Sequence, residues 1–316
     1  MQNALADIGT CAGDDVQGTE AAPARLTIAV GIATVGRRAA VARTVAELRF
    51  QTRAPDVIVV CAPEARDVAG LDCDAPNVRV LISPQGSSHQ RNAILRDLEG
   101  FDVILFMDDD FILCPTYIET TERVFLAHPD IVVATGNVVV DGIRGPGLDF
   151  DTARDIANAP PPDRSDFVQM DDVYSGYGCN MAVRLEPVAR NGIVFDEQLP
   201  LYAWLEDVDF SRQLARHGRL VRVSTMRGVH LGIKVGRSPG MRLGYSQIAN
   251  PLYLIRKGTC SWRKALFLMV RNMAANLVRS LHPEPYIDRK GRVRGNARAL
   301  YDLVAGRLSP SRILSF

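Results

Sequence analysis

The chain has 316 residues, 47% hydrophobic and 23% charged, which is typical of a globular protein. It has no uncharged apolar run of the roughly 18 residues that a membrane span needs, and its N-terminus lacks the basic start and apolar core of a secretory signal peptide. The net charge of +1 conceals a basic last third, since residues 219–316 carry 19 Lys and Arg against three acids.

Apolar strands alternate with helices through the first 130 residues. Continuous apolar runs predict buried strands, and helical spacing or capping signals predict the helices between them. The strands are expected at 25–34, 56–62, 78–83 and 102–107, and the helices within 37–51, 88–99 and 115–128. Strands that are apolar along their whole length indicate a parallel sheet covered on both faces, with ligands at the carboxyl ends of the strands.

Three adjacent carboxylates, Asp108, Asp109 and Asp110, follow the fourth strand. Like charges about 4 Å apart repel by roughly 1 kcal/mol in water, and by more where water is partly excluded. The carboxylates therefore lie on a solvated turn or face a cation. Mg²⁺ or Mn²⁺ bridging a substrate diphosphate suits such a group. Its position after a buried strand favours the cation site.

Other motifs for phosphate chemistry are weak or missing. A phosphatase of the haloacid-dehalogenase type also places D-x-D after a strand, normally with Thr or Val two residues past the second Asp. Here Phe111 and Ile112 follow Asp110, and the triplet lies far into the chain. The stretch "GIATVGRR" contains only Gly31 and Gly36, so G-x-G-x-x-G is absent, and there is no Walker loop.

The alternation weakens after residue 130. The pattern predicts a strand or strand pair at 131–142, a long Gly- and Pro-rich loop at 142–166, a strand within 174–185 and a helix within 204–218. A short strand from residue 220 is expected to lead into a loop that contains His230, and a basic, mostly helical region follows from residue 236.

Four stretches in order resemble an inverting family-two glycosyltransferase of the GT-A fold, over about Leu26 to Lys257. They are "IAVGIATVGR", "GSSHQRNAIL", "FMDDDF" and the segment from Gly178 to Gly218, which contains "FDE" and "EDVDF" in order. "YSQIANPLYLIRK" resembles the helix after the catalytic domain. The resemblance implies a GT-A-like mixed, mainly parallel sheet flanked by helices, with a basic helical C-terminal extension. It also implies metal-dependent, inverting transfer of a hexose-type sugar from a nucleotide-sugar.

The resemblance assigns roles to individual residues. Asp207 is expected to remove the acceptor proton and Glu206 to hold the acceptor. The donor side is assigned to Thr34, Arg37, Arg91, Asn92, Asp108 and Asp109; the Mn²⁺ or Mg²⁺ site to Asp108, Asp110 and His230; and the acceptor side to Gly178, Asn180 and Trp204. Asp109 is expected to face the ribose or the sugar of the donor.

Each assignment has a structural alternative. Acids in the first turn of a helix are favoured by the helix dipole alone, and Asp209 is expected to be of this kind. His230 fits a metal ligand or a buried structural histidine. Arg91 fits a fork for the diphosphate or a charge on a helix surface, while Gly178 and Asn180 also fit a tight turn.

The second strand departs from the family pattern. Acidic or amide residues that read the base are common after it, but Cys61 and Ala62 stand there, with Asp67 as a displaced candidate. The nucleotide of the donor therefore stays open among UDP, GDP and dTDP.

The basic C-terminal third suggests an anionic partner. In "SWRKALFLMVRNMAANLVRSL", helical spacing places Leu266, Val270, Met273, Leu277 and Leu281 on one face, flanked by basic residues. A basic amphipathic helix can lie on a membrane surface. It can also pack on the catalytic domain or on a second copy of the chain in a homodimer. Nucleic acid is not expected, because no aromatic base-reading module is present.

These observations divide the chain into a disordered arm (1–24), a GT-A catalytic domain (25–235, with a nucleotide-sugar half at 25–110 and an acceptor half at 111–235) and a basic helical region (236–316). The acceptor is expected to be a glycan, free or linked to a polyprenyl diphosphate, in bacterial exopolysaccharide assembly. The six cysteines, scattered without a C-x-x-C pair, favour a cytoplasmic protein. The basic amphipathic helix and a lipid-linked acceptor add the expectation of a peripheral position on the inner face of the membrane. An inactive nucleotide-binding scaffold and a metal-dependent nucleotidyltransferase remain as alternatives.

Overall fold

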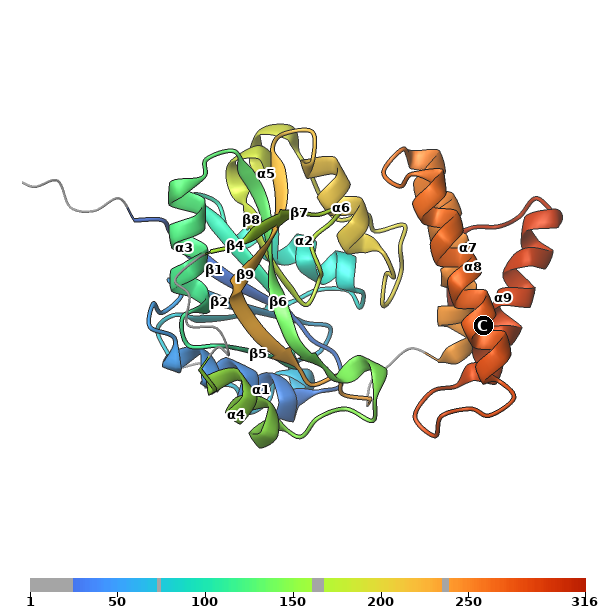
Figure 1. Ribbon diagram of the computed structural model, residues 1–316, viewed down its shortest axis with the longest axis horizontal. Coiled ribbons are helices and arrows are strands. Elements are labelled where there is room, and N and C mark those ends of the chain that lie inside the picture. The colour runs from blue at the N-terminus through green and yellow to red at the C-terminus, as the bar shows by residue number, and fades with distance from the viewer. Residues whose placement is uncertain (1–24, 73–74, 161–167, 235–238) are drawn as a thin grey trace, which may run out of the picture.

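The computed structural model describes residues 25–72, 75–160, 168–234 and 239–316. The arm expected at 1–24 lies outside the described residues. A sheet with helices on both faces forms the larger part of the molecule, and three C-terminal helices stand beside it (Figure 1).

The described strands form one mixed sheet. They are β1 (Ile28–Ala33), β2 (Val57–Ala62), β3 (Val78–Ile82), β4 (Val103–Asp108), β5 (Phe111–Leu113), β6 (Ile131–Asp141), β7 (Met170–Asp172), β8 (Asn180–Arg184) and β9 (Arg219–His230). The order is β3-β2-β1-β4-β8-β6-β9-β5, and β7 also pairs with β9. Strands β1 to β4 pair in parallel, whereas β8 runs antiparallel to β4 and β6. This is the expected mixed, mainly parallel sheet.

Helices cover both faces of the sheet, and β1 shows why its sequence is apolar throughout. They are α1 (Arg38–Glu47), α2 (Ser87–Asp97), α3 (Tyr117–Ala127), α4 (Phe150–Asn158), α5 (Leu185–Asn191) and α6 (Glu206–Leu214). Ile28, Val30 and Ile32 face the core under α1 and α3, whereas Ala29 faces the core under α2, α5 and α6. Because both sides of the strand are buried, every position is apolar.

Two predictions for the second half are wrong. The segment 142–166 is not all loop, because α4 lies within it; Asp149 caps α4 by accepting a hydrogen bond from Thr152 N at 2.9 Å. Phe150 of α4 packs beside Val229 of β9. Likewise, the predicted short strand is the 12-residue β9, which reaches His230 because β6 supports one edge and β7 and β5 support the other.

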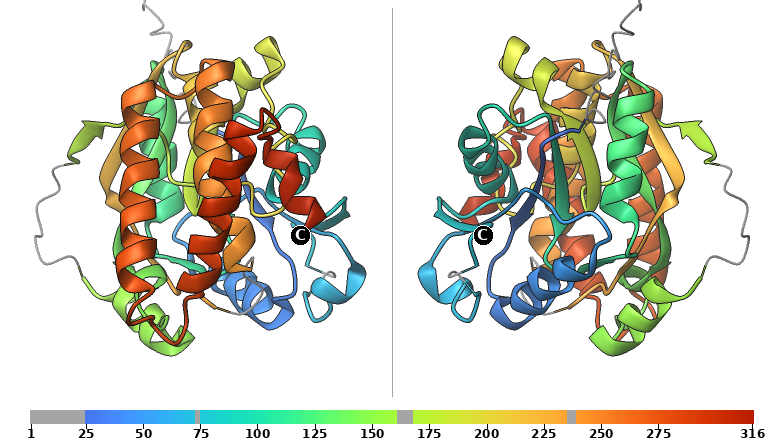
Figure 2. Two further views of the ribbon diagram at one scale, coloured as in Figure 1. Left: turned by 90° about the vertical axis from the view of Figure 1, so that its right-hand side faces the viewer. Right: turned by 90° about the vertical axis from the view of Figure 1, so that its left-hand side faces the viewer.

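The C-terminal region contains α7 (Gly240–Lys257), α8 (Trp262–Arg279) and α9 (Arg289–Val304), which pack against one another (Figure 2). Helices α7 and α9 approach closely at Gly244 and Gly295, where a Cβ on either residue would overlap the backbone of the other helix. No helix among the described residues is long and apolar enough to cross a membrane. Met273, expected on the same face of α8 as the exposed Leu266, instead packs inward beside the core around Tyr245.

Candidate active site

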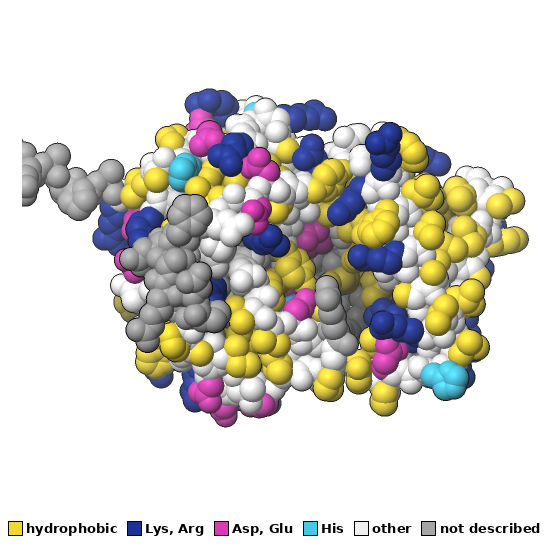
Figure 3. All heavy atoms as spheres, in the orientation of Figure 1, with side chains coloured by type: hydrophobic (Ala, Val, Ile, Leu, Met, Phe, Trp, Pro, Cys, Tyr) yellow, Lys and Arg dark blue, Asp and Glu magenta, His cyan; other side chains and the backbone are white. Residues whose placement is uncertain are grey.

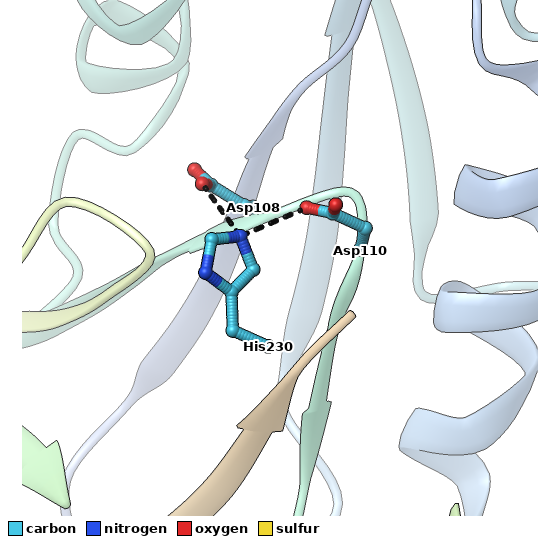
Figure 4. A group of neighbouring side chains, drawn as sticks. All are labelled: Asp108, Asp110 and His230. Carbon is cyan, nitrogen blue, oxygen red and sulfur yellow. Dashed lines mark ion pairs between the residues drawn. The ribbon is translucent and has the colours of Figure 1, made fainter. Parts of the chain in front are cut away.

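The acidic triplet forms a tight turn between two strands. Strand β4 ends at Asp108, and β5 begins at Phe111, which pairs with His230 at the end of β9. The register therefore brings His230 to the aspartates: its Nε2 lies 3.3 Å from Asp110 Oδ1 and 3.8 Å from Asp108 Oδ2 (Figure 4). His230 and Asp110 are buried, and Asp108 is partly exposed at the open side of the group.

Asp141, at the end of β6, orients the histidine. Its Oδ1 lies 2.9 Å from His230 Nδ1, which turns Nε2 toward the two aspartates. Burial lowers the pKa of His230, but hydrogen bonds with Asp110 and Asp141 and the nearby acidic charges outweigh it and raise that pKa to about 10. A carboxylate behind a ligating histidine is the usual way in which proteins fix the ring and increase its basicity.

The group fits a divalent cation. One ligand atom each from Asp108, Asp110 and His230 lie within 4.8 Å of one another. Asp110 Oδ1 is buried, with His230 Nε2 at 3.3 Å and Arg37 at 3.7 Å as long polar contacts, while Asp110 Oδ2 accepts a hydrogen bond from Ile233 N at 2.7 Å. A buried carboxylate oxygen with a spare lone pair beside an imidazole suits Mn²⁺ or Mg²⁺. The three residues predicted as ligands are thus brought together.

Asp109 points the other way, into the domain. Its Oδ2 accepts a hydrogen bond from Thr34 Oγ1 at 2.6 Å, and its Oδ1 accepts one from Arg37 at 2.8 Å. Burial raises the pKa of Asp109 to about 6, although the Arg37 charge opposes the shift. The sequence predicts that Thr34, Arg37 and Asp109 contact the nucleotide-sugar donor. The structure joins them into one cluster beside the Asp108–Asp110–His230 group, in which both oxygens of Asp109 already have partners.

Arg91 connects the Asp108–Asp110–His230 group with Glu206 and Gly178. This α2 residue is 4% exposed, and its guanidinium donates to Glu206 Oε1 at 2.9 Å and to the carbonyl oxygen of Gly178 at 2.8 Å. The same guanidinium lies 3.5 Å from Asp108 Oδ1. Arg91 is therefore not a charge on a helix surface; it pairs with the buried Glu206 and with the partly exposed Asp108.

Glu206 and Asp207 occupy the first turn of α6 and differ in their surroundings. Burial raises the pKa of Glu206 to about 8, against the lowering effect of Arg91. Burial also raises the pKa of Asp207, while hydrogen bonds from the backbone N–H groups of Gly178 and Val208 oppose it. Those bonds measure 3.1 and 2.8 Å and fix the Asp207 carboxylate beside Gly178.

The loop before α6 is strained. Leu201, Ala203 and Leu205 all have positive φ, at 59°, 48° and 76°. Each such residue costs of order 1–3 kcal/mol unless its surroundings hold it. Trp204, predicted on the acceptor side, lies in this loop, and its carbonyl oxygen accepts a hydrogen bond from Asn250 of α7 at 2.8 Å. The C-terminal helices therefore help to hold the segment that presents Glu206.

Asn92 and Asn180 are buried within the protein framework. The Asn92 side chain exchanges hydrogen bonds with the backbone of Phe195 at 2.8 and 2.9 Å and donates to Glu197 Oε1, so it holds the "FDE" loop rather than facing open space. Asn180 Oδ1 accepts from Thr135 at 2.8 Å, and its Nδ2 is buried without a partner among the described residues. Their predicted contacts with donor and acceptor stay predictions.

Asp67, the displaced candidate for reading the base, is also buried. Its Oδ1 accepts a hydrogen bond from Gly36 N at 3.1 Å and so fixes the turn after β1.

Asp209 has a larger role than the helix-dipole charge expected from the sequence. It is fully buried, and it accepts hydrogen bonds from Lys257 Nζ at 2.7 Å and Thr259 Oγ1 at 2.6 Å. Lys257 also reaches Asp196 at 2.6 Å. These contacts connect the end of α7 to α6 and the "FDE" loop. Sequence reasoning did not identify Asp141 or Lys257; an acid closing the apolar run "NVVVD" was the available signal for Asp141.

Comparison with known proteins agrees with this architecture. Solved structures that match include GalNAc-T7 with UDP, GalNAc and Mn²⁺ (TM-score 0.53, 16% identity, 90% of this chain and 59% of that one). Another is a mannosyltransferase from Pyrobaculum calidifontis with GDP-Man and Mn²⁺ (TM-score 0.52, 15% identity, 92% of this chain and 86% of that one). A third is S. aureus TarS 1–349 with UDP-GlcNAc (TM-score 0.54, 15% identity, 91% of this chain and 83% of that one). The chain has a GT-A fold. No family model and no curated protein sequence matches it, and it spans about 59% of the GalNAc-T7 chain.

Proposed function

We propose that the protein is a metal-dependent, inverting glycosyltransferase. It would transfer a sugar from a UDP-, GDP- or dTDP-sugar to a glycan or polyprenyl-diphosphate-linked glycan in bacterial polysaccharide assembly, on the cytoplasmic side. The observation that carries the proposal is the continuous network from the Asp108–Asp110–His230 group through Arg91 to Glu206 and Asp207. Its setting in a GT-A fold, whose compared members hold nucleotide sugars or their fragments, supports it.

In this proposal Asp207 is the general base. It takes the proton of the acceptor hydroxyl as that oxygen bonds to the anomeric carbon, and the bond from that carbon to the diphosphate oxygen breaks on the opposite side. The nucleoside diphosphate leaves and the anomeric configuration inverts. Burial raises the pKa of Asp207, which makes its carboxylate a stronger base than an exposed aspartate.

The other groups position the acceptor and balance the charges of the site. Burial raises the pKa of Glu206 to about 8, and its Oε1 already accepts a hydrogen bond from Arg91, so Glu206 suits holding the acceptor better than removing its proton. Arg91 pairs with the buried Glu206 on one side and with the partly exposed Asp108 on the other. A cation held by Asp108, Asp110 and His230 would supply charge stabilisation for the departing diphosphate.

The test is release of nucleoside diphosphate from a panel of nucleotide sugars with Mn²⁺, with and without a glycan acceptor. Asp207→Asn should lower acceptor-dependent turnover by about 10²- to 10⁴-fold, and EDTA should abolish it. Asp172→Asn, at an exposed site, is the matched control and should keep full activity. The anomeric configuration of the product should be inverted. Full activity of Asp207→Asn in EDTA, or a retained configuration, would contradict the proposal.

A further inference from the structure

Helix α8 has an apolar face that the rest of the described chain leaves uncovered. Its inner face, through Ala265 and Leu268, packs on Leu205 and Val208 around the start of α6. The opposite side, here called the α8 outer face, carries large apolar residues that are 48–67% exposed. They are Trp262, Leu266, Phe267, Val270, Leu277 and Val278. A shallow, open hollow lies along the N-terminal half of this face, between Trp262 and Arg271.

The charged residues of helix α8 itself are all basic. The guanidinium groups of Arg263 and Arg271 lie 5.5 Å from the ring centres of Trp262 and Phe267 respectively, so basic and aromatic groups alternate along the face. Within the described part of the chain, Arg263 and Arg271 form no ion pair with an acidic side chain. Hydrophobic and basic side chains predominate over the C-terminal helices on the side shown in Figure 3.

We propose that the α8 outer face docks on the surface of an anionic lipid bilayer. Apolar side chains would enter the boundary between headgroups and acyl chains, and the arginines would meet lipid phosphates. A second copy of the chain fits the charges poorly, because a two-fold contact through this face would bring arginines against arginines without an acid between them. A nucleic-acid partner would leave the apolar side chains of the α8 outer face in contact with water and phosphate groups.

The docking surface is close to the proposed active site. Because the inner face of α8 packs on Leu205 and Val208, residues that flank Glu206 and Asp207, about one helix diameter of 10 Å separates the bilayer from that segment. A lipid-linked acceptor would thus reach the site along the surface that holds the enzyme. The binding itself does not require turnover, so it can succeed or fail independently of the proposed reaction.

Sedimentation of the full chain with vesicles tests the proposal. The protein should bind vesicles containing phosphatidylglycerol, bind phosphatidylcholine vesicles weakly, and lose affinity as salt rises. Arg263→Gln with Arg271→Gln should weaken binding about 25-fold, at about fivefold for each basic residue near an anionic surface. Trp262→Ser with Phe267→Ser should weaken it at least tenfold. Because all four side chains are exposed, circular dichroism and the unfolding midpoint should not change.

The chain offers a matched control. Arg49 lies 4.7 Å from the ring centre of Phe50, an equally exposed cation–aromatic pair on the catalytic part of the molecule. Arg49→Gln with Phe50→Ser should bind vesicles like the wild type, as should Asp207→Asn. The proposal is overturned if the wild type ignores anionic vesicles, if the α8 variants bind normally, or if the Arg49 and Phe50 variant is equally impaired. A dimer broken by Trp262→Ser, without vesicle binding, would also overturn it.

Discussion

Replacing Arg91 with methionine removes the guanidinium that joins the two acidic halves of the site. Met is similar in length and apolar, so the change deletes the charge and the donors more than the volume. Glu206 loses its partner at 2.9 Å, the Gly178 carbonyl loses its donor at 2.8 Å, and Asp108 loses a positive charge at 3.5 Å. The Arg91 and Glu206 side chains are only 5% and 11% exposed, so water cannot replace these contacts fully.

The expected cost follows from breaking a buried pair from one side, about 3–5 kcal/mol in the free energy of unfolding. The cost should depend on pH. The folded pKa of Glu206 is already raised to about 8, above its ordinary 4.5, so ionised Glu206 destabilises the fold and stability falls as pH rises through that range. Without Arg91 this pKa rises further. Arg91→Met should therefore lose more stability between pH 6 and pH 9 than the wild type.

Urea unfolding at both pH values measures the effect, with Arg91→Met, Glu206→Gln and the double variant forming a cycle. The double variant should recover much of the loss at pH 9, because it no longer buries an unpaired carboxylate. A coupling energy above about 1 kcal/mol supports the linked network. Additive single effects at pH 9, or a cost for Arg91→Met that is unchanged between the two pH values, would refute the reasoning.

Three other substitutions probe separate parts of the account. Asp141→Ala should weaken Mn²⁺ binding about 10- to 100-fold in calorimetry, because His230 loses the carboxylate that orients it; unchanged affinity would exclude that role. Asp209→Asn should lower the free energy of unfolding by about 3 kcal/mol in urea, since Lys257 loses a fully buried partner, and an effect below 1 kcal/mol would contradict the proposed anchor. Gly136→Ala should cost about 1–3 kcal/mol because its Cβ would overlap Met226 and Tyr117, whereas the control Gly145→Ala, with open space around it, should be near neutral.

The parallel half of the fold could be read from the sequence because its strands are apolar on both faces. Strand β1 shows this: every residue is buried or nearly so, and the run stands out against its flanks. Helix α4 could not be read in this way, because it is short and lies between Gly- and Pro-rich segments. The length of β9 could not be predicted either, because β9 is extended by pairing with β5, β6 and β7, and these contacts depend on the tertiary fold.

The candidate site shows the same division. The metal group was predicted because a carboxylate cluster after a buried strand is a local signal, and a family resemblance added His230. The partners of those residues were not predictable, because Arg91 meets Glu206 and Asp109 meets Thr34 across separations of 115 and 75 residues. Asn92 is the clearest example. Its position in a motif predicted a contact with the nucleotide-sugar donor, whereas in the structure its side-chain amide donates hydrogen bonds to the Phe195 carbonyl and to Glu197.

The central claim is that Asp108, Asp110 and His230 bind a divalent cation that brings a nucleoside diphosphate to the site. The most direct test is calorimetric titration of UDP, GDP and dTDP into the wild type and Asp110→Asn, each with Mn²⁺ and with EDTA. The account predicts binding of at least one nucleotide by the wild type with Mn²⁺, and loss of that binding in EDTA and in the variant. Equal binding under all conditions, or binding of Mn²⁺ by Asp110→Asn with unchanged affinity, would contradict it.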